Sequence, residues 1–164
     1  MKVSVAEYNI SNLDEEVILS GWISKKRNLG GLFFIDLRDR SGIIQLNINN
    51  ECKDYELVSK LKVESVIEVK GKVIKRESIN TNLKTGEIEV LVDSVKVLNE
   101  AADLPFDFNN NTALEDTRLK YRYLDLRRDS LKNNIMTKHK IMKSARNFLD
   151  NSGFVEIETP ILCK

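Results

Sequence analysis

Histidine, cysteine and proline are scarce in this sequence. Its 164 residues include one histidine, two cysteines and two prolines. Cys52 and Cys163 lie too far apart in the sequence to form a metal-ligand spacing or a disulfide framework, and His139 alone cannot supply a histidine-based metal site. The composition therefore predicts no metal site and no disulfide framework.

Long apolar runs and a strong net charge are also missing. No segment approaches the ~18 apolar residues of a membrane-spanning helix, and the N-terminal MKVSVAEYNISNLDEE has no apolar signal core. A net charge of +1 does not indicate non-specific nucleic-acid binding over the whole surface, so any such site must be a local patch. Because 41% of the residues are hydrophobic and 31% are charged, we expect a globular cytoplasmic protein that does not bind membranes.

The first hundred residues show the alternation of β-strands. A short helix fits 53–62, where Tyr55, Val58 and Leu61 have helical spacing. Strands are expected at 15–27, 30–40, 41–49, 65–77 and 86–98. Five strands with a helix between the third and the fourth match the five-stranded Greek-key OB barrel. We therefore predict a mainly β domain over residues 1–103.

The composition changes after residue 103. LPFDFNNNT has little periodicity, which predicts a linker over 104–113. The pattern is helical from there on, with an apolar stripe over 130–153 and Gly153 suited to a helix stop. The following GFVEIETPIL is strand-like and rich in apolar side chains. We predict a second, α+β segment over residues 114–164.

An aromatic residue and polar residues share the outer face of the predicted barrel. Strand periodicity turns Ile35 inward and Phe34 outward, with Gln45 and Glu89 on the same exposed face and Arg27 nearby. Aromatic rings stack on unpaired bases, contributing roughly 1–3 kcal/mol per base, and side-chain donors and acceptors read base edges. The pattern is thus typical of a site for single-stranded nucleic acid.

Two simpler interpretations of the same face stay open. A single outward phenylalanine is often covered by a loop or a neighbouring domain. The short basic run of Lys25, Lys26 and Arg27 can be merely solvated, although beside an aromatic side chain it can also contact phosphates. Periodicity alone leads no further than an OB fold whose outer face suits single-stranded nucleic acid.

Four longer motifs resemble one family. GWISKKRNLGGLFFIDLRDRSGIIQL (21–46) and TGEIEVLV (85–92) are similar to the anticodon-binding domain of class IIb aminoacyl-tRNA synthetases, which serve aspartate, asparagine and lysine. LEDTRLKYRYLDLRR (114–128) resembles the hinge of bacterial aspartyl-tRNA synthetases, and GFVEIETPIL (153–162) resembles class II motif 1. The hinge joined to motif 1 favours the aspartate enzymes over the other two.

The resemblance implies a role for individual residues. Phe34 matches the aromatic that stacks on the central uridine of the anticodon, Gln45 the residue that binds that uridine's edge, and Arg27 an arginine near the same base. Glu89 matches a carboxylate that faces the anticodon, and it suits the donor edge of a guanine-like wobble base. Arg76, Asn80 and Asn82 match candidates for the third base, and Pro160 matches the proline at the dimer interface. In the loop between the first two strands, a leucine such as Leu29 goes more often with strict specificity for tRNA-Asp, and a histidine with relaxed specificity.

The resemblance also implies which reaction is involved. The family's enzymes are homodimers that activate aspartate with ATP and Mg²⁺ and transfer it to tRNA-Asp. Motifs 2 and 3, which would follow motif 1, do not occur in these 164 residues. We therefore expect no catalytic residues, no bound cofactor and no catalysis from this chain by itself, but tRNA binding through the barrel, with no role for DNA.

Three alternatives stand beside this interpretation. The chain could be a free-standing OB-fold protein that binds single-stranded nucleic acid, although such a protein has no need of motif 1. It could be part of an asparaginyl- or lysyl-tRNA synthetase, which anticodon stem-loops of the three specificities would distinguish. It could also be a dimerisation segment whose barrel is only a scaffold.

The two-part organisation predicts the outcome of limited proteolysis. Because the barrel core closes on itself, cleavage should begin within 104–113 and leave a stable product of roughly the first hundred residues that still binds an anticodon stem-loop. Mass spectrometry of the products and a binding titration would check both points. Simultaneous loss of both parts would show that the chain is a single cooperative unit.

Overall fold

The computed structural model describes residues 4–107 and 113–162. The chain divides into two compact units, Met1–Asp103 and Leu104–Lys164, which are described separately below. Much of the predicted linker, together with Cys163, lies outside the described residues.

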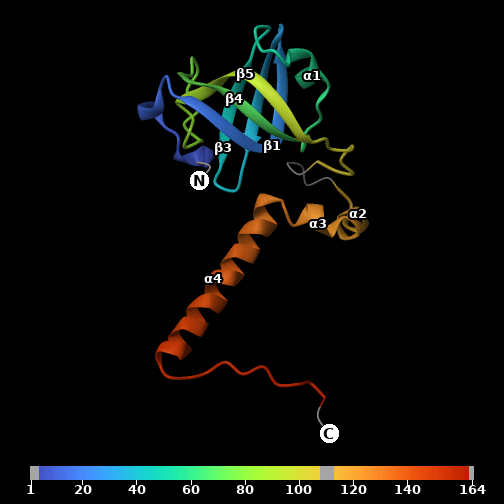
Figure 1. Ribbon diagram of the computed structural model, residues 1–164. Coiled ribbons are helices and arrows are strands. Elements are labelled where there is room, and N and C mark those ends of the chain that lie inside the picture. The colour runs from blue at the N-terminus through green and yellow to red at the C-terminus, as the bar shows by residue number, and fades with distance from the viewer. Residues whose placement is uncertain (1–3, 108–112, 163–164) are drawn as a thin grey trace. The chain divides into compact units, whose positions relative to one another are not determined.

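The first unit is a closed five-stranded barrel with the strand order β1-β2-β3-β5-β4 (Figure 1). The β3–β5 pair is parallel and the other pairs are antiparallel. The strands are β1 Glu16–Leu29, β2 Leu32–Arg38, β3 Ile43–Ile48, β4 Val66–Lys75 and β5 Ile88–Asn99, with helix α1 at Tyr55–Lys60 and 3₁₀ turns η1 Val5–Glu7 and η2 Ile10–Asn12. This architecture confirms the predicted OB barrel.

Alternate strand residues fill the barrel core. Ile35 of β2, Leu46 of β3 and Val90 of β5 are fully buried, and Ile35 and Leu46 are partners across β2 and β3. The other inward-facing residues of these three strands are also buried, with at most 5% of any of them exposed: Phe33, Leu37, Ile44, Ile48, Ile88 and Val92. The period-2 pattern therefore determined which face of each strand packs on the core.

Strand β1 contains a register shift between Ile23 and Lys25 that regular alternation does not predict. Ile23 faces the core opposite Leu37, whereas Lys26 pairs with inward Ile35 and Arg27 pairs with outward Phe34. An extra residue at a β-bulge shifts all following side chains to the opposite face. Without the bulge, Arg27 would point into the barrel.

The bulge directs Lys26 to the carboxyl end of α1. Its Nζ donates hydrogen bonds to the carbonyls of Val58 (2.7 Å), Ser59 (2.7 Å) and Leu61 (3.0 Å). The ammonium also lies 5.0 Å from the centre of the Phe33 ring, and burial lowers its pKa. Lys26 therefore caps a helix. Neither interpretation of the basic run, solvated or in contact with phosphates, describes this residue, because its Nζ is engaged by three carbonyls.

The second unit contains α2 Glu115–Lys120, α3 Arg122–Asp125 and α4 Asp129–Asn151. A single carboxylate joins them, because Asp125 is fully buried and accepts from Arg118 (3.1 Å), Arg122 (2.6 Å) and Arg128 (3.3 Å). Burial acts to raise the pKa of Asp125, but the hydrogen bonds and charges of the arginines outweigh it and hold the pKa below its ordinary value. Sequence periodicity gave no sign of this cluster.

Helix α4 ends where the sequence predicts. Gly153 has φ +85°, the N–H of Phe154 donates to the carbonyl of Leu149, and the N–H of Gly153 donates to that of Asp150. This pattern is a Schellman motif, whose left-handed residue favours glycine. Among the residues that the structure describes, no helix is both long enough and apolar enough to span a membrane.

The strand expected after Gly153 is not formed. Residues 154–160 have no regular secondary structure. Arg146 of α4 holds this segment through hydrogen bonds to both carboxylate oxygens of Glu156 (3.1 and 2.9 Å). A strand needs a partner for its backbone groups, and the described part of this unit provides only helices.

The helix cap formed by Lys26 can be tested by mutation. Lys26→Met keeps the apolar stem but removes the donor for three carbonyls, so we expect the free energy of unfolding to fall by about 1–3 kcal/mol. Lys25→Met, a matched change at an exposed neighbour, should stay within about 0.5 kcal/mol of the parent. Urea denaturation of both variants would measure the difference, and equal stabilities would refute the capping role.

Candidate nucleic-acid interface

A groove of about 380 Å³ lies on the outer face of the barrel. Most of the residues predicted from the sequence for nucleic-acid binding line it. They are Arg27, Leu29, Phe34, Gln45, Arg76 and Glu89, and the other lining residues are Leu32, Asn47, Ile74, Lys75, Glu77 and Ser78. The barrel thus brings together residues from all five strands.

Strand pairing places the polar and aromatic groups side by side. Arg27 of β1 is paired with Phe34 of β2, which is paired in turn with Asn47 of β3. Gln45 of β3 is paired with Glu89 of β5. Directly opposed residues on one face have neighbouring side chains, so the pairing alone accounts for the grouping.

Hydrogen bonds connect the side chains at the floor of the groove. The Nε2 of Gln45 donates to Glu89 Oε2 at 2.6 Å, and Asn47 Nδ2 donates to Glu89 Oε1 at 2.9 Å. Gln45 Oε1 accepts from Arg76 at 2.9 Å and from Arg27 at 3.3 Å. Both amides present their NH₂ groups to Glu89 because an ionised carboxylate only accepts hydrogen bonds.

Gln45 and Glu89 are less accessible than expected. The prediction placed them on an exposed face, but their exposed fractions are only 5% and 6%. They do point away from the core, yet the flanking side chains of the groove cover them. Phe34 is half-buried and Arg27 is exposed, with its guanidinium 3.9 Å from Asp36 Oδ1. The groove therefore has an accessible rim and a deep polar floor.

The arrangement combines three kinds of recognition chemistry. Phe34 offers an aromatic ring, with apolar Leu32 and Ile74 also lining the groove. Glu89 supplies acceptors and Gln45 supplies a donor and an acceptor. The cationic Arg27 and Arg76 both donate to Gln45 Oε1, and guanidinium groups can also bind phosphate.

Two predicted residues do not line the groove. Asn80 Oδ1 accepts the N–H of Asn82 at 3.1 Å, and the backbone N–H of Asn80 donates to the carbonyl of Gly86 at 3.0 Å. Asn80 thus organises the turn between β4 and β5.

Asn47 lines the groove but was not predicted as a site residue. Its outward position two residues after Gln45 was a usable signal.

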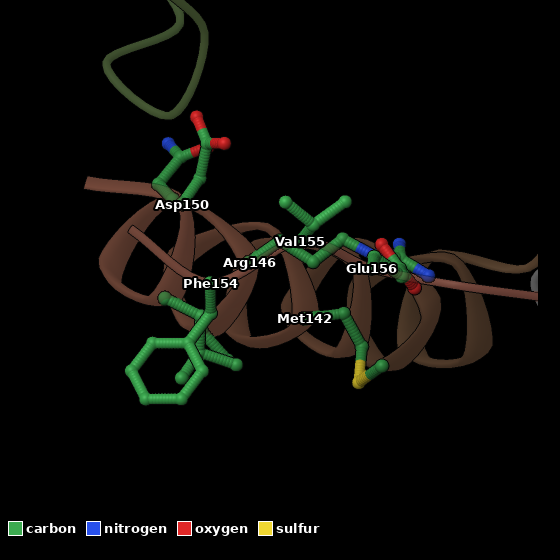
Figure 2. Close-up of a pocket in the computed structure, with 9 residues that line it drawn as sticks. Met142, Arg146, Asp150, Phe154, Val155 and Glu156 are labelled. Carbon is green, nitrogen blue, oxygen red and sulfur yellow. The ribbon is translucent and has the colours of Figure 1, made fainter. Parts of the chain in front are cut away.

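A second hollow, of about 520 Å³, lies in the helical unit. Figure 2 shows Met142, Arg146 and Asp150 of α4 beside Phe154, Val155 and Glu156, where the chain runs back along the helix. Phe154 and Val155 are 64% and 80% exposed, and Ile161 beyond them is fully exposed. Pro160, the predicted interface residue, lies in the same exposed segment. Large apolar side chains of this segment are therefore exposed, and exposed apolar patches commonly mark interaction surfaces.

Comparison with known families matches both units. The family described as OB-fold nucleic acid binding domain matches residues 17–98, and the family described as tRNA synthetases class II (D, K and N) matches residues 114–164. The chain belongs to the OB-fold nucleic-acid-binding family. Its second unit contains a segment similar to the class II synthetases.

Curated relatives specify the group more closely. An aspartate–tRNA ligase of Agathobacter rectalis is 48% identical over 163 residues, which is 96% of this chain and 27% of the relative. An aspartate–tRNA(Asp/Asn) ligase of Thermoanaerobacter pseudethanolicus is 44% identical over 96% of this chain and 28% of the relative. The predicted resemblance to the aspartyl-tRNA synthetases is thereby confirmed. This chain spans about a quarter of the length of these relatives.

Solved structures have the same fold. An asparaginyl-tRNA synthetase of Pyrococcus horikoshii, complexed with asparaginyl-adenylate, is 27% identical and has a TM-score of 0.84 over 98% of this chain and 37% of that one. An aspartyl-tRNA synthetase of Entamoeba histolytica has a TM-score of 0.89 at 21% identity, covering 99% of this chain and 40% of its own, which shows the fold alone.

Proposed function

We propose that this chain reads the anticodon of tRNA-Asp as part of an aspartate–tRNA ligase. The observation that carries the proposal is the groove that Phe34 lines together with amide, carboxylate and guanidinium groups. The similarity to aspartate–tRNA ligases over both units supports it. Such a role in translation would place the protein in the cytoplasm, bound to tRNA and not to DNA.

The central uridine would stack on Phe34 and meet Gln45. Uracil presents the N3–H donor beside a carbonyl acceptor, and Gln45 can complement both. One N–H of its amide is held by Glu89, which leaves the other for the base. Its oxygen accepts two arginine N–H groups, of which the Arg27 bond, at 3.3 Å, is the longer. The base would displace Arg27, whose exposed guanidinium is then available to a phosphate.

A guanine in the first anticodon position would bind Glu89. Each carboxylate oxygen already accepts one amide N–H, from Gln45 or Asn47, and each has a second lone pair. Guanine offers N1–H and N2–H on one edge, so it can fill both. Arg76 at the floor, with Asn80 and Asn82 on the β4–β5 turn, is assigned to the third base, and Leu29 at the rim to strict specificity for tRNA-Asp.

The complete enzyme would attach aspartate to the tRNA at the expense of ATP, with Mg²⁺. None of the motif 2 or motif 3 residues that would hold these groups occurs in the 164 residues. Within the described ranges, no cluster of three or more Asp, Glu, His or Cys side chains could hold a metal ion. The apolar residues around Pro160 would be covered by the remainder of the catalytic domain and by the second subunit of a homodimer.

Substitution of Phe34 tests the proposed groove. Phe34→Ala should weaken binding of a tRNA-Asp anticodon stem-loop by about 1–3 kcal/mol because a stacking partner is lost. Ile35→Ala, at the fully buried neighbour, should instead lower the free energy of unfolding by about 2–5 kcal/mol. Fluorescence anisotropy titration and urea denaturation measure the two effects separately.

The outcome also distinguishes the alternatives. Stem-loops with asparagine and lysine anticodons should bind more weakly than that for aspartate, whereas a general single-strand binder would not discriminate. If Phe34→Ala leaves binding intact and destabilises the chain as much as Ile35→Ala does, then Phe34 is a core residue and the proposal fails.

A second prediction concerns chemistry. The 164-residue chain should show no aspartate-dependent ATP–pyrophosphate exchange because it contains no ATP-binding motif. The assay should be run at several protein concentrations beside a full-length aspartate–tRNA ligase as the positive control. Exchange that scales with the concentration of the pure chain would contradict the assignment of catalysis to motifs absent from it.

A further inference from the structure

Asn47 makes one side-chain hydrogen bond at the floor of the groove. Its Nδ2 donates to Glu89 Oε1 at 2.9 Å, while its Oδ1 is buried and has no hydrogen-bond partner within the described residues. A buried polar atom without a partner is unfavourable, and an apolar side chain of similar size would avoid it. The one contact that distinguishes Asn47 from such a side chain is the contact with Glu89.

Glu89 depends on its neighbours for its orientation. The carboxylate is held between two amides, with Gln45 on Oε2 at 2.6 Å and Asn47 on Oε1 at 2.9 Å. Gln45 also accepts from Arg27 and Arg76, so it is coupled to the rest of the floor. Asn47 acts on Glu89 alone. With one bond on each oxygen, the carboxylate plane is fixed and its remaining lone pairs keep a defined direction.

We infer that Asn47 is a positioning residue that orients Glu89 to accept the N1–H and N2–H groups of a guanine base. The inference rests on the proposed function, which it extends to the discrimination of the first anticodon base. Asn47 determines specificity through Glu89. Without the Asn47 bond, Glu89 would still be buried beside Gln45, but it could rotate about its last side-chain bond and lose the paired geometry that selects guanine.

The experiment compares two synthetic anticodon stem-loops that carry guanosine or inosine in the first position. Inosine lacks the N2 amine and keeps the N1–H. The unmodified 164-residue chain should prefer guanosine by about tenfold, the usual effect of one hydrogen bond to a charged group. Asn47→Leu should reduce this preference to less than about twofold, and so should Glu89→Gln. The double variant should lose no more than either single variant.

A matched pair of charge-changing variants separates orientation from electrostatics. Asn47→Asp keeps the shape but cannot donate to Glu89, so it should also abolish the preference for guanosine. Asn50→Asp adds the same charge at an exposed residue outside the groove lining. It should weaken the binding of both stem-loops equally and therefore keep the preference for guanosine. Thermal melting by circular dichroism should show that the four single variants and the double variant all fold.

Each result has a defined meaning. Retention of the guanosine preference in folded Asn47→Leu and Asn47→Asp would overturn the role of Asn47 and leave the proposed function standing. A wild-type chain that binds the stem-loops without preferring guanosine would overturn the role of Glu89 and, with it, this inference. A wild-type chain that binds neither stem-loop would refute the proposed function itself.

Discussion

The register shift in β1 is the constraint on which the groove depends. Up to Ile23 the strand turns every second side chain into the barrel, and after the shift it turns the other set inward. One extra residue thereby places Arg27 beside Phe34 and sends Lys26 to the end of α1. A bulge is a local change in backbone pairing. Here it gives two adjacent cations different roles, because Arg27 faces the groove and Lys26 caps α1.

Hydrogen bonds from two neutral amides, and not ion pairs, hold the polar network at the floor of the groove. Glu89 is nearly fully buried, and burial of a carboxylate without partners would be strongly unfavourable. Its two amide donors satisfy both oxygens, and the two arginines act through Gln45 instead of forming an ion pair with Glu89. Within the part of the chain that the structure describes, the network leaves lone pairs on Glu89 and one N–H on Gln45 without a partner, and these are the groups that the proposed function assigns to a base edge.

The second unit is held together by ion pairs and not by a hydrophobic core such as that of the barrel. Its short helices are tied by Asp125 and three arginines, while much of the apolar surface of α4 and of the following segment is exposed. An ion-pair cluster can fix the local path of the chain, but it does not bury the area that a hydrophobic core would. The barrel, by contrast, closes around its own side chains and needs no further layer.

What the sequence determined by itself was the alternation in the strands, the helix stop at Gly153 and the motifs that identify the family. These features depend on neighbouring residues, so local periodicity and turn chemistry are sufficient to find them. The outward direction of Phe34, Gln45 and Glu89 followed from the same periodicity. The tertiary structure alone decided that Gln45 and Glu89 are covered, that Asn47 joins them, that Lys26 caps α1 and that Asp125 gathers three arginines. The first three depend on a bulge or on contacts between residues distant in the chain, and a one-residue change of register reverses the face of every side chain that follows. The Asp125 cluster is local, with its arginines three to seven positions away, but it depends on how the chain turns between α2, α3 and α4.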